Sequence, residues 1–111
     1  MKAGEAWRAE MRSATGPISI VTTNSEQTLR IPSGKKELTY SFANGELRKR
    51  TGDDGMWHVV LPKVKKSQME IDKRDQVTAW RWEVELDSQR KNAKVRPLFT
   101  FEVVPGNSTA P

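Results

Sequence analysis

The chain has 111 residues, of which 35% are hydrophobic and 30% are charged, and its net charge is +5. This length suits one domain, and the absence of cysteine excludes disulfides, thiolate catalysis and cysteine-bound metal. No run approaches the ~18 apolar residues of a membrane helix, and no apolar signal-peptide core lies near the start. The basic balance is compatible with nucleic acid, anionic lipid or an acidic protein face as partner, although a solvated basic surface is the simpler interpretation.

The first predicted element is a helix over residues 3–14. Its apolar residues recur at steps of four, four and three, so they share one face of the helix. The Gly-Pro pair at 16–17 ends the pattern, because glycine suits a C-terminal cap and proline cannot continue a helix. No obvious N-cap precedes the pattern, so we expect this helix to be the end of a longer one. The apolar face consists of Ala3, Trp7, Met11 and Ala14.

Strands are predicted for almost all of the remaining chain, because apolar and polar residues alternate in short runs. The Asn-Gly pair at 44–45 predicts a type I′ turn, since both positions need positive φ. A two-residue turn places Ala43 opposite Glu46 and Phe42 opposite Leu47, which agrees with the apolar pattern. The expected strands cover residues 18–23, 28–32, 37–43, 46–50, 56–62, 64–72, 77–87 and 95–104.

The last two long strands carry two tryptophans and two phenylalanines. In residues 77–87, Trp80 and Trp82 alternate with charged residues and are therefore expected on one buried face. Phe99 and Phe101 share a phase in the final strand. We expect the indoles to pack against the N-terminal helix and one of the two phenylalanines. The predicted contact between helix and sheet consists of Trp7, Met11, Trp80, Trp82, Phe99 and Phe101.

Together these elements predict a single α+β domain over residues 1–104, followed by a flexible tail over 105–111. One N-terminal helix is expected to pack on an antiparallel sheet of about seven short strands. The sheet has one apolar face, and the helix is the only element within the chain that can cover it. Polar loops are expected at 51–55 and 87–94, where turn-forming and polar residues cluster.

No catalytic or metal-binding constellation emerges from the sequence. His58 is the only histidine, and a lone histidine in a strand is more often half-buried than a metal ligand. The run TGDDG at 51–55 lacks the alternating ligand spacing of a calcium loop and is interpreted as a turn. Glu83 and Glu85 share a strand face with Arg81, which favours a salt-bridged surface over an acid–base pair. We therefore expect no enzymatic activity, cofactor, metal or small-molecule substrate.

Nucleic-acid binding is considered because the chain combines basic stretches with aromatic residues, whose rings can stack on bases. A stacking platform needs aromatic rings and cations on the same face. Alternation instead places Arg48 and Arg50 opposite Tyr40 and Phe42, and it separates Arg81 from the neighbouring indoles. The aromatic residues are therefore predicted to be core, and nucleic acid is the less favoured partner. The candidate partner-binding surface consists of Arg48, Lys49, Arg50, Lys65 and Lys66.

Four segments, taken in order over residues 5–105, resemble the globular domain of minor pseudopilins and minor type IV pilins, and most closely the J-type minor pseudopilin of type II secretion. They are similar to the end of the long pilin helix, a strand leading into a tyrosine-containing hairpin, a leucine-containing strand with its successor, and the closing strand pair. The segments read WRAEMRSATGP, LRIPSGKKELTYSFANGELRKR, VVLPKVKKSQMEI and VTAWRWEVELDSQRKNAKVRPLFTFEVVP. The family's Gly-Phe-Thr-Leu-Ile-Glu cleavage motif and its apolar helix are not in this sequence.

The resemblance implies a structural or assembly subunit of a type II secretion pseudopilus or a type IV pilus, acting by protein–protein interaction. The predicted helix would be the C-terminal part of a pilin helix, whose apolar part anchors the natural protein in the inner membrane. Expected partners are other pseudopilin or pilin subunits, at the periplasmic face of the inner membrane or in an extracellular filament. The alternative, from the residues alone, is a basic β-rich binding module that contacts DNA or another anionic partner.

Overall fold

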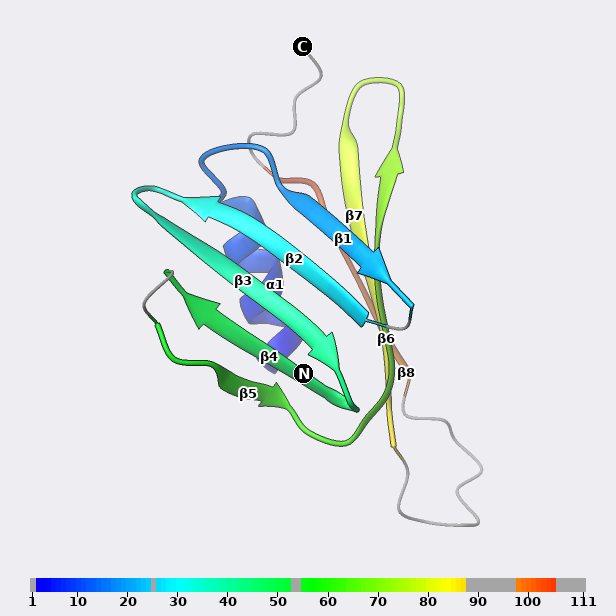
Figure 1. Ribbon diagram of the computed structural model, residues 1–111. Helices are drawn as coiled ribbons and strands as arrows, with labels where there is room; N and C mark the ends of the chain where they lie inside the picture. Colours follow the sequence, from blue (N-terminus) through cyan, green and yellow to red (C-terminus); the bar gives the residue numbers. More distant parts are fainter. Residues whose placement is uncertain (1, 25, 53–54, 88–97, 106–111) are drawn as a thin grey trace.

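One helix and eight strands make up the described part of the chain (Figure 1). Helix α1 covers Lys2–Arg12, so it ends two residues before the end predicted from the sequence. The computed structural model describes residues 2–24, 26–52, 55–87 and 98–105. The strands are β1 (Ser19–Thr23), β2 (Glu26–Ser33), β3 (Lys36–Ala43), β4 (Glu46–Thr51), β5 (His58–Leu61), β6 (Val64–Lys73), β7 (Thr78–Leu86) and β8 (Leu98–Val103).

Parts of several predicted segments lie outside the described residues. These parts are Asp53 and Asp54 of the predicted turn, the predicted loop beyond Asp87, the beginning of the last predicted strand up to position 97, and the predicted tail beyond Pro105.

The strands form two antiparallel sheets rather than one. Strands β1 to β5 follow one another in a five-stranded sheet, called sheet A, and β6, β7 and β8 form a three-stranded sheet, called sheet B. Figure 1 shows sheet A as one layer, with the strands of sheet B crossing beside and behind it. The predicted pilin-like arrangement, one helix packed on a single antiparallel sheet of about seven short strands, is therefore wrong.

The chain leaves sheet A at the short connection between β5 and β6. Pro62 has no N–H to donate to a ladder, and Lys63 adopts a φ of 53°, a left-handed conformation that few non-glycine residues take. The N–H of Val64 then donates to the Gly45 carbonyl at 2.8 Å, and the N–H of Asp87 donates to the Lys63 carbonyl at 2.7 Å. These features direct β6 away from β5, so β6 pairs with β7 instead of extending the first sheet.

The hairpin between β3 and β4 confirms the turn predicted at positions 44–45. Both turn residues have positive φ, 53° for the asparagine and 74° for the glycine. Ala43 lies opposite Glu46 and Phe42 lies opposite Leu47, in the predicted register. The turn chemistry and the apolar alternation therefore select the same strand pairing.

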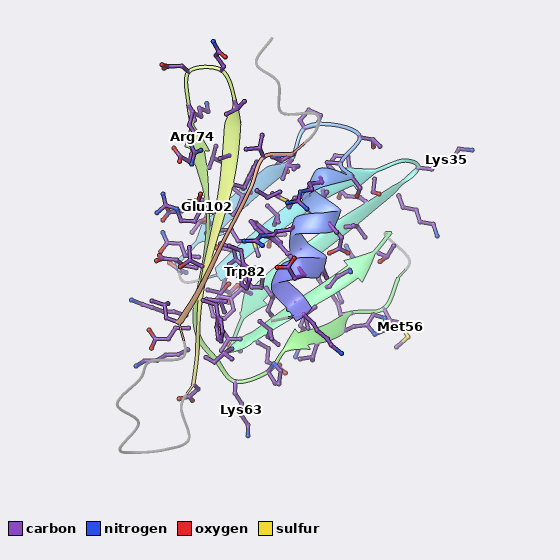
Figure 2. All side chains as sticks on the ribbon, turned by 180° about the vertical axis from the view of Figure 1, so that it is seen from behind. Lys35, Met56, Lys63, Arg74, Trp82 and Glu102 are labelled. Carbon is purple, nitrogen blue, oxygen red and sulfur yellow. The ribbon has the colours of Figure 1, made fainter. Side chains whose placement is uncertain are left out.

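Helix α1 lies between the inner faces of the two sheets, against β8 and β2. Trp7 and Met11 are completely buried, and the Trp7 ring centroid lies 5.6 Å from that of Trp82 on β7. The Trp82 ring lies 5.5 Å from that of Phe101 on β8. Figure 2 shows Trp82 in the space between sheet B and α1. The helix is thus part of a core shared by both sheets, instead of a cover over one of them.

The other residues of the predicted helix–sheet contact have different environments. Trp80 is buried on the inner face of β7, where it lies opposite Ile71 on one side and Val103 on the other. Phe99 lies opposite Val84 on the same inner face, yet it is 37% exposed. The core beside α1 therefore uses Phe101 as its β8 phenylalanine, and Phe99 remains partly open to solvent.

Gly4 marks the closest approach of α1 to sheet B. A Cβ atom at this position would lie 2.1 Å from the Phe101 ring, far inside van der Waals contact. Alanine would gain about 1 kcal/mol of helix propensity over glycine, but the ring or the helix would have to move. We expect Gly4→Ala to lower the free energy of unfolding by about 1–3 kcal/mol, the usual cost of overpacking, measured by urea denaturation.

The companion experiment for Gly4→Ala repeats it in a Phe101→Leu background, where the smaller side chain leaves room for the added methyl group. There the alanine should be much less harmful, because the steric cost is removed while the propensity gain remains. Equal destabilisation in both backgrounds, or a stabilising effect of Gly4→Ala alone, would contradict this close approach.

A buried glutamine connects the two sheets directly. The side-chain amide of Gln27 on β2 donates to the Met69 carbonyl at 3.2 Å, and its oxygen accepts the Met69 N–H at 2.8 Å. The same amide nitrogen donates to the Thr22 hydroxyl at 3.1 Å. Gln27 therefore pairs with β6 in the way that a neighbouring strand would, and it satisfies polar groups that are expensive to leave unpaired when buried.

Candidate functional site

The outer face of sheet A, turned away from α1, carries a row of residues aligned across the strands. Arg30 on β2 lies opposite Thr39 on β3, and Thr39 lies opposite Arg50 on β4. Ser19 on β1 lies opposite Arg30 and extends the row to the sheet edge. Thr39 is buried although it belongs to the outer face. The register therefore places Arg30 and Arg50 two strands apart on one face, with Thr39 between them.

A second row runs beside the first. Arg48 on β4 lies opposite Ser41 on one side and Val59 of β5 on the other. The Arg48 guanidinium donates to a Glu46 carboxylate oxygen at 2.6 Å, and both side chains are partly exposed. Since a pair of this exposure contributes little to stability, the guanidinium remains available to a stronger anionic partner.

Trp57, which immediately precedes β5, lies over this same face. It is 40% exposed, and the Arg50 guanidinium stacks over its ring at 4.8 Å from the centroid. A hollow of about 130 Å³ adjoins it on the side of β3 and the β3–β4 turn. The hollow is lined by Ser41, Ala43, Asn44, Arg48 and Trp57. We call the surface formed by Arg30, Arg48, Arg50 and Trp57 the arginine–tryptophan face.

The electrostatics of this face favour an anion from outside the chain. Within the described residues, neither Arg30 nor Arg50 forms an ion pair. The Arg50 Nε is buried and has no hydrogen-bond partner there. Carboxylates stand at the borders: Glu46 pairs with Arg48, and Glu37 lies on β3 opposite Pro32. The two unpaired guanidinium groups therefore lie between these borders.

The five basic residues predicted as a partner-binding surface do not form one surface. Arg48 and Arg50 lie on the outer face of sheet A, whereas Lys49 turns inward and donates to Glu10 of α1. Lys65 lies on β6, where its Nζ is 3.4 Å from a carboxylate oxygen of the buried Glu85. Lys66 lies opposite Glu85, and both residues line a polar cavity between the two sheets. Lys49 thus has a structural role, and the other two lysines lie on β6 of sheet B.

Glu10 of α1 connects the helix to sheet A through two side chains. The Tyr40 hydroxyl and the Lys49 ammonium both donate to its carboxylate. Burial, together with the hydrogen bond to Glu10 and its negative charge, raises the pKa of Tyr40 far above its ordinary value of 10.0. The network lies on the inner side of sheet A, so it fixes α1 and does not contribute to the arginine–tryptophan face.

A larger polar cavity, of about 720 Å³, lies between the two sheets near Gln27. It includes side chains from β1, β2, β6 and β7, among them Thr22, Lys65, Ser67 and Glu85. Ser67 is committed to the core, because its hydroxyl accepts a hydrogen bond from the Trp82 Nε1–H at 3.0 Å. Glu85 is paired with Lys65. Ser67 and Glu85 of this cavity therefore already have partners within the chain.

The remaining candidates for chemistry are dispersed. His58 is exposed on β5, opposite Lys49. Across the residues that the structure covers, no group of three or more histidine, cysteine or acidic side chains is arranged to hold a metal ion. In the same part of the chain, no helix has the length and apolarity needed to cross a bilayer.

Sequence reasoning missed Arg30 and Trp57 as members of a surface. Trp57 falls in the strand predicted over 56–62 and among the aromatic residues predicted to be core, and Arg30 falls between Leu29 and Ile31 in the strand predicted over 28–32. Within β4 the alternation does place Arg48 and Arg50 together. The missing information is the pairing of β4 with β5 and β2 with β3, which brings residues from four segments into adjacent rows.

Comparisons with known proteins identify no similar family or protein. The chain matches no protein-family model, and neither curated proteins nor solved structures give a match.

Proposed function

We propose that this protein is a structural subunit that acts by protein–protein contact, of the minor pseudopilin or minor pilin kind. The observation that carries the proposal is the attachment of α1 to both sheets. Trp7 packs on Trp82 of sheet B, and Glu10 binds Tyr40 and Lys49 of sheet A. A helix held on two sides can position the whole β domain on an assembly, because it cannot move without disrupting the common core.

The resemblance of the four sequence segments to minor pseudopilins gives this mechanical role its context. In such an assembly the helix would continue upstream into a filament core, and the β domain would face its neighbours. Among the described strands, β1 and β5 of sheet A and β8 of sheet B are edge strands, and edges of this kind can pair with a strand of a neighbouring subunit. This role does not require the single seven-stranded sheet that the structure rules out.

The experiment is deletion of the natural gene in its host, followed by assays of type II secretion and of surface filaments. We expect one of the two to be lost and to return when the gene is supplied again. The coding region upstream of Met1 is expected to encode an apolar helix preceded by a basic leader and a glycine. Intact secretion and intact filaments in the deletion strain, together with an upstream region lacking such a helix, would contradict the proposal.

A pair of variants separates attachment of the helix from the presence of the protein. Glu10→Gln weakens the contact of α1 with sheet A, because a neutral amide no longer pairs with the Lys49 ammonium. Lys35→Gln changes the exposed β2–β3 turn, away from α1. We expect Glu10→Gln to restore less function than Lys35→Gln at equal protein levels, with immunoblotting as the measure of abundance.

A further inference from the structure

The arginine–tryptophan face combines two features that alternation along single strands had separated. Trp57 and the three arginines lie on the same side of sheet A, which is the outer side. The other three tryptophans, Trp7, Trp80 and Trp82, are buried, so Trp57 is the one indole of the chain that a ligand can reach. An exposed ring beside cations on the same face is the arrangement required of a stacking platform, and two of these arginines, Arg30 and Arg50, form no ion pair within the described residues.

We propose that the arginine–tryptophan face binds single-stranded nucleic acid, with one base on Trp57 and phosphates on Arg30, Arg48 and Arg50. This activity is separate from the proposed assembly role and does not depend on it. The hollow of about 130 Å³ beside the indole provides space next to the ring for the edge of a base. The hydroxyl of Ser41 and the side chain of Asn44 line this hollow and offer hydrogen-bonding groups to the base.

The state of Arg50 supports phosphate binding in particular. Its guanidinium carbon lies over the Trp57 ring, 4.8 Å from the centroid, so the cation is held beside the exposed indole. A guanidinium held against an aromatic ring loses less side-chain freedom when its donors bind a phosphate. Within the described residues Arg50 forms no ion pair, so a phosphate would not compete with a carboxylate for this guanidinium.

Arg30 offers a second phosphate-binding group on the same face of sheet A. It lies in one row with Arg50, with the buried Thr39 between them. Two strand spacings separate the two arginine backbones, which is roughly 10 Å. Glu37 and Glu46 stand on either side of this row and repel a polyanion. A bound strand is therefore directed across β2, β3 and β4 toward Trp57, and not along any one of them.

Single-stranded nucleic acid fits this surface better than two other anionic partners. In a duplex the bases are stacked on one another, so Trp57 could not reach a base face. An acidic peptide would satisfy the arginines but would leave the exposed indole and its adjoining hollow unexplained. A second copy of this chain is disfavoured by charge, because each copy carries +5.

The test measures binding of fluorescein-labelled oligothymidylate to the whole chain by fluorescence anisotropy at low and at physiological salt. We expect binding at low salt that weakens by roughly 10- to 20-fold between 50 and 200 mM salt, as three phosphate contacts to a single strand predict. Quenching of the tryptophan fluorescence should accompany binding. Heparin, an acidic peptide and duplex DNA of equal length serve as competitors, and each should compete less well than unlabelled oligothymidylate.

The variants identify the surface that binds. Trp57→Ala should weaken binding by about 5- to 150-fold, the range of losing one stacked base, and it should abolish the fluorescence quenching. Arg50→Gln should reduce the slope of binding against salt by roughly 0.7, the share of one phosphate. Lys66→Gln removes the same charge from an exposed position on sheet B and serves as the matched control.

The possible results have distinct meanings. No binding at low salt overturns the proposal, and so does binding for which heparin or the acidic peptide competes as well as oligothymidylate. Equal losses for Arg50→Gln and Lys66→Gln, with no effect of Trp57→Ala, would show general attraction to a basic protein and also overturn it. The assembly role is tested by gene deletion in the host, so either proposal can fail without the other.

Discussion

Replacement of Trp82 by alanine is expected to lower the free energy of unfolding by about 3–5 kcal/mol, the usual cost of truncating a large buried aromatic side chain. Trp82 is completely buried and lies between the rings of Trp7 and Phe101. Its Nε1–H also donates to Ser67, so truncation leaves a buried hydroxyl without this partner. Urea denaturation followed by far-ultraviolet circular dichroism measures the change without relying on tryptophan fluorescence.

Trp57→Ala is the matched control, because it removes the same side chain from an exposed position. It loses a cation–π contact with Arg50, worth about 0.5–1 kcal/mol at a surface. We therefore expect Trp57→Ala to unfold close to the unaltered protein. A comparable loss in both variants would refute the assignment of Trp82 to the shared core and Trp57 to the surface.

The second large effect concerns stability at high pH. The pKa of Tyr40 is raised in the folded protein by burial and by the hydrogen bond and charge of Glu10. In the unfolded chain the hydroxyl ionises near its ordinary pKa of 10.0, so the unfolded state loses a proton there that the folded state keeps. The stabilisation is thus fully present below pH 10 and is lost as pH rises above it, by about 1.4 kcal/mol per pH unit.

Two measurements check the behaviour of Tyr40. It is the only tyrosine of the chain, so the ultraviolet absorbance of tyrosinate reports this single group. We expect it to ionise only together with unfolding, well above the ordinary tyrosine pKa. Tyr40→Phe removes the ionising group, and its free energy of unfolding should decline less steeply above pH 10. Reversible ionisation of Tyr40 near pH 10 in the folded protein would contradict the buried network.

Strand β4 takes part both in the attachment of α1, through Lys49, and in the arginine–tryptophan face, through Arg48 and Arg50. Glu10 holds α1 on the inner side of sheet A, while Arg48 and Arg50, on either side of Lys49, face outward on the same strand. Strand alternation therefore assigns β4 two roles, helix attachment through one face and anion binding through the other. Variants of the outward arginines should leave helix attachment intact, which makes the binding experiment interpretable.

Much of the local structure is predictable from the sequence alone. The Asn-Gly turn and its register follow from the φ values that such a pair tolerates, and the inward phase of Trp80, Trp82 and Phe101 follows from the two-residue strand period. The helical face of Trp7 and Met11 follows in the same way from the helical period. These features depend on residues close together in the chain, and a periodic pattern records them directly.

Only the tertiary structure decided how these elements are combined. The division into two sheets arises where Pro62 and Lys63 turn the chain away from β5. A short connection between consecutive strands would by itself favour a hairpin that extends the first sheet. The inward pairing of Lys49 with Glu10 and the outward stacking of Arg50 on Trp57 likewise join distant segments. The alternation of apolar and polar residues predicts that the two faces of a strand differ. It does not predict which strands pair or which element covers each face. That choice depends on long-range contacts, here the insertion of α1 between the sheets, which leaves the outer face of sheet A free to carry its arginines and its tryptophan.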